Sequence, residues 1–152
     1  KKIIALFDIP VLREYIRMLL DENFENRYTF KTIFKFILDV KTISRELNYA
    51  LYVKPKRFIN HKTYNKFYEN IFSKDNDFVT IDPTISFYRL IKTSDIVISM
   101  PFSSTAYTGL HLNKRSCYYW PNKSDYIDIN YKEDAIPLIR DKITLRRWIL
   151  EN

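Results

Sequence analysis

The chain has 152 residues, of which 46% are hydrophobic, which suits one domain with a substantial core and argues against disorder. A single cysteine, Cys117, excludes an intramolecular disulfide and a cysteine-based zinc cluster, so a reducing interior is the expected compartment. The net charge of +7 favours anionic partners, and the single glycine, Gly109, excludes the glycine-rich phosphate loops of the Rossmann and Walker types.

The first half of the chain predicts two strands on either side of a long helix. Residues 2–9 form an apolar run that stops before Pro10, as expected of a strand covered on both faces of a parallel sheet. Apolar side chains then recur at helical spacing as far as residue 48, with Thr29 placed to cap that helix. Residues 49–53 predict the second strand, and Pro55 closes it.

The second half predicts strands and helices in alternation. Strands are expected at residues 78–81, 95–100 and 114–120, and helices at residues 83–91, 103–112 and 143–150. Five strands alternating with helices predict a Rossmann-like three-layer α/β sandwich with a mainly parallel sheet, in one domain over residues 1–152. The chain begins directly in a strand and without Met, so we expect it to be part of a longer two-domain protein.

An aromatic stripe precedes the third predicted strand. Its members are spaced i, i+3, i+4 and i+7, which is typical of a buried helix face rather than of a surface that stacks bases: Tyr64, Phe67, Tyr68 and Ile71. The basic charge leaves a nucleic-acid-binding α/β module as an alternative function. Because the aromatic residues lie in apolar stripes and are not interleaved with Lys and Arg, no nucleic-acid partner is expected.

Three consecutive hydroxyl residues, Ser103, Ser104 and Thr105, follow the fourth predicted strand and open the next helix. A helix N-terminus offers free backbone N–H groups and favours an anion, and ligands of open α/β sheets lie beyond the carboxyl ends of the strands. The residues therefore predict a phosphate site, with simple helix capping as the alternative. Gly109, one turn inside this helix, indicates close packing of the helix on the sheet.

Charged residues follow three other predicted strands. Lys54, Lys56 and Arg57 come after the second strand and could neutralise a phosphate, or form a solvated loop. Asp82, before Pro83, could bind a ribose hydroxyl or cap the helix that starts at Pro83.

A further charged residue, Asp8, follows the first predicted strand, but no neighbour in the sequence identifies a proton-transfer partner for it. His61 and His111 lack metal-ligand spacing, so no metal is expected.

Four segments carry a resemblance to a known family: residues 53–58, 81–91, 94–106 and 110–119. They resemble the bacterial surface-polysaccharide biosynthesis proteins named for a Pro-Phe-Thr-Ser motif and, more distantly, the C-terminal half of GT-B glycosyltransferases. The motif falls on residues 101–104, where Ser103 replaces threonine and keeps the hydroxyl group.

The resemblance implies a domain that binds a nucleotide sugar without a metal or other cofactor. Similar bacterial sialyl- and Kdo-transferases hold the donor phosphate with a Ser-Ser motif, matched here by Ser103-Ser104, and CMP with a His-Pro motif, in whose place this chain has Lys54-Pro55. The donor is then CMP-linked or carries another base. The implied phosphate-binding residues are Ser103, Ser104, Thr105, Lys54, Lys56 and Arg57, and the implied nucleoside-binding residues are Asp82, Pro83 and Phe102.

The resemblance also implies a role in building a cell-surface polysaccharide in the cytoplasm, with or without peripheral contact to the inner membrane. GT-B enzymes draw the general base and the acceptor site from an N-terminal domain, so this domain alone is expected to bind a donor and not to turn it over. An epimerase-like nucleotide-sugar enzyme is a further alternative. It would need paired carboxylates, for which Asp8 and Asp82 are the candidates.

Overall fold

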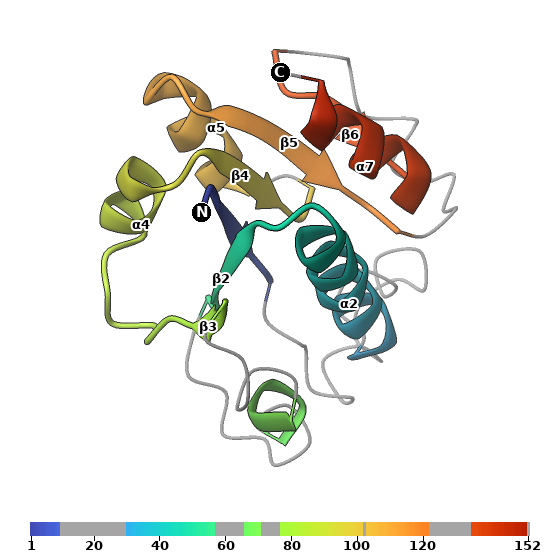
Figure 1. Cartoon of the computed structure of the whole chain (residues 1–152). Helices are drawn as coiled ribbons and strands as arrows, with labels where there is room; N and C mark the ends of the chain where they lie inside the picture. Colours follow the sequence, from blue (N-terminus) through green and yellow to red (C-terminus); the bar gives the residue numbers. More distant parts are fainter. Residues whose placement is uncertain (10–29, 57–65, 71–76, 102, 122–134, 152) are drawn as a thin grey trace, which may run out of the picture.

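The fold is a parallel β-sheet covered by helices on both faces (Figure 1). The computed structural model describes residues 1–9, 30–56, 66–70, 77–101, 103–121 and 135–151. Within them the sheet has six strands in the order β3-β2-β1-β4-β5-β6, and every pairing is parallel. The strands are β1 (Ile3–Phe7), β2 (Ala50–Lys54), β3 (Phe78–Thr80), β4 (Ile96–Ser99), β5 (Arg115–Tyr119) and β6 (Leu138–Ile139). The predicted Rossmann-like α/β class is confirmed.

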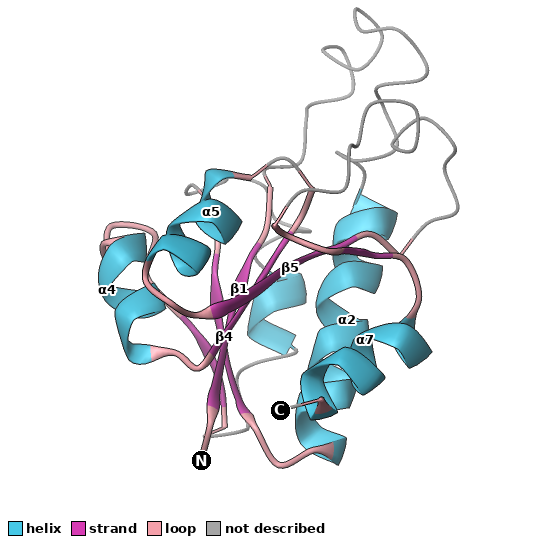
Figure 2. Cartoon of the chain, turned by 90° about the horizontal axis from the view of Figure 1, so that it is seen from above, coloured by secondary structure: helices cyan, strands magenta, loops and turns pink. Residues whose placement is uncertain are grey.

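Helices lie in two layers, one on each face of the sheet (Figure 2). On one face are α2 (Phe30–Glu46) and α7 (Lys142–Leu150), and on the other are the shorter helices α4 (Phe87–Thr93) and α5 (Ser104–His111). Residues 66–70 are also helical. Within this short helix Phe67 stacks on Phe34 of α2 with ring centroids 3.6 Å apart, and Tyr68 is buried, so the predicted buried aromatic face is confirmed for these two residues.

Alternation of side chains along β1 explains the two unequal cores. Ile4 and Leu6 face the larger core beneath α2 and α7, whereas Ala5 and Phe7 face a smaller core with α4. Because both faces are covered, β1 reads as a continuous apolar run rather than as an alternating one. That run is why the strand could be predicted from the sequence.

Two predicted features differ from the structure. Strand β6 was not predicted, because a strand of only two residues, Leu138–Ile139, has no periodicity to detect. The helix expected to start at Pro83 starts at Phe87 instead, since residues 82–84 form a turn in which Ile85 N–H donates to the Asp82 carbonyl at 3.0 Å. The predicted capping of a helix by Asp82 is therefore wrong.

The order of the strands fixes where a ligand can bind. From β1 the chain proceeds outward through β2 and β3, then returns to the centre and proceeds outward on the other side through β4, β5 and β6. Strands β1 and β4 are neighbours, so the order reverses between them. In open α/β sheets ligands bind beyond the carboxyl ends of the strands at such a reversal. Here those ends are Phe7 and Ser99.

Gly109 lets α5 approach the sheet closely, as predicted. A Cβ atom added to it would collide with Ser116 Oγ of β5 and would lie 2.9 Å from Val97 Cγ2 of β4. We expect Gly109→Ala to lower the free energy of unfolding by up to about 2 kcal/mol, because overpacking costs about 1–3 kcal/mol and the gain in helix propensity offsets about 1 kcal/mol of it. Urea denaturation measures the change.

Val97→Ala supplies the control for this prediction, because it removes the Val97 Cγ2 methyl, one of the groups that the new Cβ would meet. The double variant Gly109→Ala/Val97→Ala should lose less stability than the sum of the two single variants. Full additivity, or a more stable Gly109→Ala variant, would show that the helix is not held against β4 at this point.

Candidate functional site

The start of α5 carries three hydroxyl groups at the carboxyl end of β4. Ser103 caps the helix, and its Oγ accepts a hydrogen bond from Thr105 N–H at 3.5 Å and lies 2.7 Å from Thr105 Oγ1. Ser104 is the first residue of the helix and is exposed. Tyr118 of β5 donates its hydroxyl hydrogen to the Ser103 carbonyl at 3.0 Å, which fixes the entry to the helix. Capping, the predicted alternative, is thus present in the structure.

Lys54, the last residue of β2, has a largely buried side chain with 7% exposure. Its Nζ donates a hydrogen bond to the Pro83 carbonyl at 2.7 Å. Burial lowers the pKa of Lys54 below the ordinary lysine value, and the nearby carboxylates of Asp82 and Asp8 oppose that shift. Lys54 is therefore a charged group whose environment becomes more favourable when an anion binds beside it.

Asp8 organises the loop that follows β2. Its side chain is buried with 3% exposure, directly beyond the end of β1. One carboxylate oxygen accepts the Lys56 backbone N–H at 2.9 Å, and the other accepts the Tyr68 hydroxyl hydrogen. These bonds attach the Lys56 loop and the 66–70 helix to the centre of the sheet.

A cavity of about 330 Å³ lies where these groups meet. It is lined by Phe7, Asp8, Lys54, Pro55, Lys56, Phe87, Ser103, Ser104 and Thr105. The lining comes from the ends of β1 and β2 and the starts of α4 and α5, at the point where the strand order reverses. Five of the six residues predicted to bind phosphate thus line a single cavity, and the sixth, Arg57, lies outside the described residues.

The residues predicted to bind the nucleoside are not brought together in the same way. Asp82 is exposed, and its carboxylate accepts hydrogen bonds from the Thr84 N–H at 2.8 Å and the Thr84 hydroxyl at 2.7 Å, which lower its pKa. Pro83 contributes its carbonyl to Lys54, and Phe102 lies outside the part of the chain that the structure describes. Neither Asp82 nor Pro83 is among the described lining residues of the cavity.

The same geometry bears on the epimerase alternative, which needs two carboxylates in one cavity. Asp8 lines the cavity, but Asp82 does not, and the Asp82 carboxylate is engaged by Thr84. The described residues therefore offer no carboxylate pair in that cavity.

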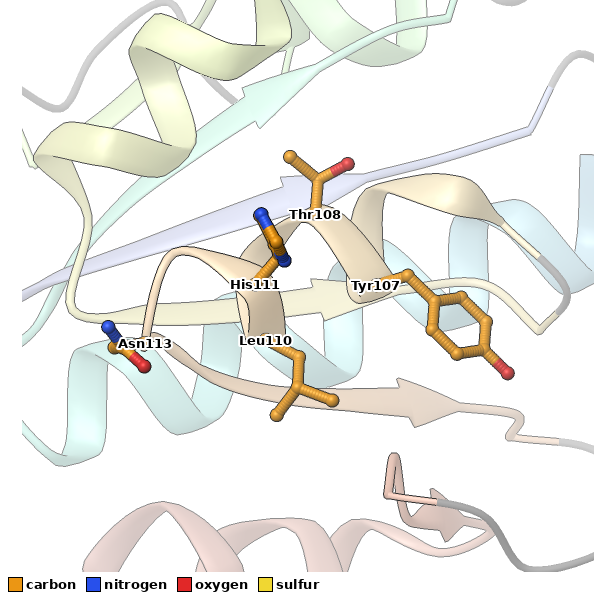
Figure 3. Close-up of a pocket in the computed structure, with 5 residues that line it drawn as sticks. All are labelled: Tyr107, Thr108, Leu110, His111 and Asn113. Atoms are coloured by element: carbon orange, nitrogen blue, oxygen red, sulfur yellow. The ribbon is translucent and has the colours of Figure 1, made fainter.

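A second, more open cavity of about 700 Å³ lies on the outer side of α5 (Figure 3). It is lined by Tyr107, Thr108, Leu110, His111 and Asn113. In Figure 3 Thr108 and His111 point to one side of the helix, and Tyr107 and Leu110 point to the other. Of the residues predicted to bind the donor, none of those that the structure describes is in the lining of this cavity.

Three lining or supporting residues were not identified from the sequence as parts of the site. Phe87 lines the cavity because α4 begins later than predicted. Ser99 ends β4 fully buried and contacts Thr105, yet it reads in the sequence as part of an apolar strand. Asp8 was identified from the sequence as a strand-end carboxylate and as a candidate for the epimerase alternative, but not as a residue that organises the site, because its partner Tyr68 lies 60 residues away.

The environment of Lys54 gives a pH prediction for anion binding. A lysine with a depressed pKa loses its proton at lower pH than an ordinary one, so the affinity for a phosphate-containing ligand should fall as the pH rises through that depressed pKa. Calorimetric titrations between pH 7 and pH 10 measure the profile. In Lys54→Arg, whose guanidinium stays protonated, the decline over this range should disappear. An unchanged decline in that variant would assign it to another group.

Two general findings concern the described residues alone. None of their helices combines the length and the apolar character that crossing a bilayer requires. Among them no three His, Cys, Asp or Glu side chains lie close enough together to hold a metal ion. Cys117 is fully buried in the larger core, where burial raises the pKa of its thiol.

Comparison with known protein families identifies the group to which the chain is related. The sequence model described as "Polysaccharide biosynthesis PFTS motif protein" matches residues 1–149. The chain belongs to this family. The segment that resembles the motif in the family's name ends in Ser103 and Ser104, which line the cavity. The family resemblance predicted from the sequence is confirmed.

Comparisons with individual proteins give less information about the chain than the family model does. No curated protein sequence matches the chain. Among solved structures, a similar one is that of KpsC from Thermosulfurimonas dismutans, described as a beta Kdo 2,4 transferase, with 17% sequence identity and a TM-score of 0.46. The alignment covers 79% of this chain and 34% of KpsC, so this PFTS-family chain spans about a third of that protein's length.

Proposed function

We propose that this PFTS-family domain binds the phosphate of a nucleotide-linked sugar, as the donor-binding part of a GT-B-type glycosyltransferase that builds a bacterial surface polysaccharide. The observation that carries the proposal is the cavity that Ser103, Ser104 and Thr105 line together with the basic residues Lys54 and Lys56. Hydroxyl groups, helix N–H groups and ammonium groups are all donors to phosphate oxygens.

The location and size of the cavity support the same proposal. A cavity of about 330 Å³ lies at the lower end of the range of small-molecule sites and can hold part of a nucleotide. It opens at the carboxyl edge of a parallel sheet, where nucleotide ligands of open α/β folds are held. Membership in a polysaccharide biosynthesis family makes a nucleotide sugar the natural choice among phosphate-containing ligands.

Each group has an assigned part in this proposal. Ser103 and Ser104 donate hydrogen bonds to the phosphate, Thr105 lines the same cavity and contacts Ser103, and Lys54 and Lys56 neutralise the phosphate charge. Asp82 and Pro83 are assigned to the nucleoside, because the Pro83 carbonyl accepts a hydrogen bond from Lys54, which lines the cavity. The acceptor, the general base and any membrane contact are assigned to a further domain of the protein.

Thermal-shift titrations with CMP, UDP, GDP and a short DNA duplex at two salt concentrations test the proposal. At ten times its dissociation constant a ligand adds about 1.4 kcal/mol to stability, which raises the melting temperature by roughly 3–6 °C in a domain of this size. We expect one nucleotide to give this shift and to identify the base, with cytidine and uridine as phosphate-free controls. A shift with DNA alone that salt abolishes would instead support the nucleic-acid module.

A further inference from the structure

A row of three hydroxyl groups connects the interior of the protein to the proposed phosphate site. Ser99 Oγ lies 2.7 Å from Thr105 Oγ1, and Thr105 Oγ1 lies 2.7 Å from Ser103 Oγ. Ser99 is fully buried at the end of β4, whereas Ser103 lines the cavity. The row thus extends from a buried position to the position where a ligand would bind.

The buried end of the row determines the direction in which the protons point. Each hydroxyl has one proton to donate. Among the described residues, the Ser99 hydroxyl forms its hydrogen bond with the Thr105 hydroxyl. A buried hydroxyl whose proton finds no acceptor is destabilised, so Ser99 donates to Thr105. Thr105 can then donate its own proton to Ser103. Ser103 can in turn donate its proton to a group in the cavity.

We propose that Ser99, acting through Thr105, is a positioning residue that orients the Ser103 hydroxyl as a donor toward the cavity. Ser103 Oγ accepts the Thr105 backbone N–H and lies 2.7 Å from Thr105 Oγ1; when it also accepts the Thr105 hydroxyl hydrogen, donation is its remaining role. Hydrogen bonds in such a chain polarise one another, so the outermost proton becomes a better donor. The site therefore selects a group that only accepts hydrogen bonds, such as a phosphate oxygen.

This inference rests on the proposed function, but inorganic phosphate tests it without reference to any nucleotide. Shifts of the backbone amide signals of residues 103–106 during a phosphate titration give the affinity. We expect Ser99→Ala and Thr105→Val to weaken phosphate binding by about 3- to 10-fold, because each breaks the row. Thr105→Ser, which keeps the hydroxyl, is the conservative counterpart of Thr105→Val and should recover affinity that Thr105→Val loses.

A double-mutant cycle separates orientation from a merely structural effect. Once Ser103 is replaced by alanine, the row has no outer hydroxyl to orient, so adding Ser99→Ala should cause no further loss of phosphate affinity. An equal loss in both backgrounds would overturn the inference, because it would mean that Ser99 acts through packing. Urea denaturation of each variant confirms that the compared proteins are folded.

The outcomes distinguish this inference from the proposed function. Phosphate binding that depends on Ser103 but not on Ser99 overturns the orientation by Ser99 and leaves the proposed function intact. Phosphate binding that depends on both, with no binding of CMP, UDP or GDP, supports the orientation and contradicts the proposed nucleotide donor. The absence of any phosphate binding overturns both.

Discussion

Replacing Ser103 and Ser104 together with alanine is expected to lower the affinity for the nucleotide identified by titration by about 100-fold. Hydrogen bonds to a charged partner contribute about 1.5–3 kcal/mol each, and two bonds at the lower end of that range correspond to about 3 kcal/mol. Calorimetric titration measures the change. Binding of the matching nucleoside, which lacks phosphate, should be nearly unaffected, because both hydroxyl groups are assigned to the phosphate.

The fold of this double variant should survive. Loss of the Ser103 cap costs about 1 kcal/mol, and Ser104 is exposed. Thr108→Ala is the matched control, because Thr108 lies on the same helix, lines the other cavity and donates its hydroxyl hydrogen to the Ser104 carbonyl. A folded double variant with wild-type affinity would remove the phosphate assignment from the start of α5.

Asp8→Ala is expected to lower the free energy of unfolding by about 2–5 kcal/mol. The buried carboxylate accepts hydrogen bonds from the Lys56 N–H and the Tyr68 hydroxyl, and an unpaired buried donor costs about 1–3 kcal/mol. Lys54 also loses a neighbouring negative charge. Urea denaturation followed by circular dichroism gives the stability.

Two milder variants keep this prediction measurable if Asp8→Ala does not fold. Asp8→Asn retains one oxygen acceptor and should lose less stability, whereas Tyr68→Phe removes a single donor and should cost about 1 kcal/mol. Combining these two substitutions should cost less than their sum, because they share a hydrogen bond. Surface substitutions change the free energy of unfolding by roughly 0.5 kcal/mol or less. If Asp8→Ala lowers it by no more than that, Asp8 does not organise the site.

Most of the fold could be predicted because both faces of the sheet are covered. Continuous apolar runs such as Ile3–Phe7 and Ile96–Ser99 appear in the sequence as buried strands, and the amphipathic pattern of Phe30–Glu46 appears as a helix. The delayed start of α4 could not be predicted, because Asp82-Pro83 is equally compatible with a turn and with a helix start. The order of the strands is a tertiary property that no local pattern encodes.

The candidate site could be predicted where its chemistry is contiguous in the sequence. Ser103, Ser104 and Thr105 form one hydroxyl run, and Lys54 and Lys56 follow one strand, so each group was visible by itself. The structure adds the convergence of the two groups in one cavity. The roles of Asp8 and Ser99 depend on partners brought close by folding, namely Tyr68 and Thr105, and therefore could not be predicted.

The measurement that tests the central claim most directly is a map of backbone amide signals of the isotope-labelled domain during titration with the nucleotide identified above. The account predicts that the largest shifts fall on Lys56 and on residues 103–105, which line the cavity of about 330 Å³. Shifts confined to residues 107–113, around the second cavity, or spread evenly over the basic surface would contradict a phosphate site at the carboxyl edge of the sheet.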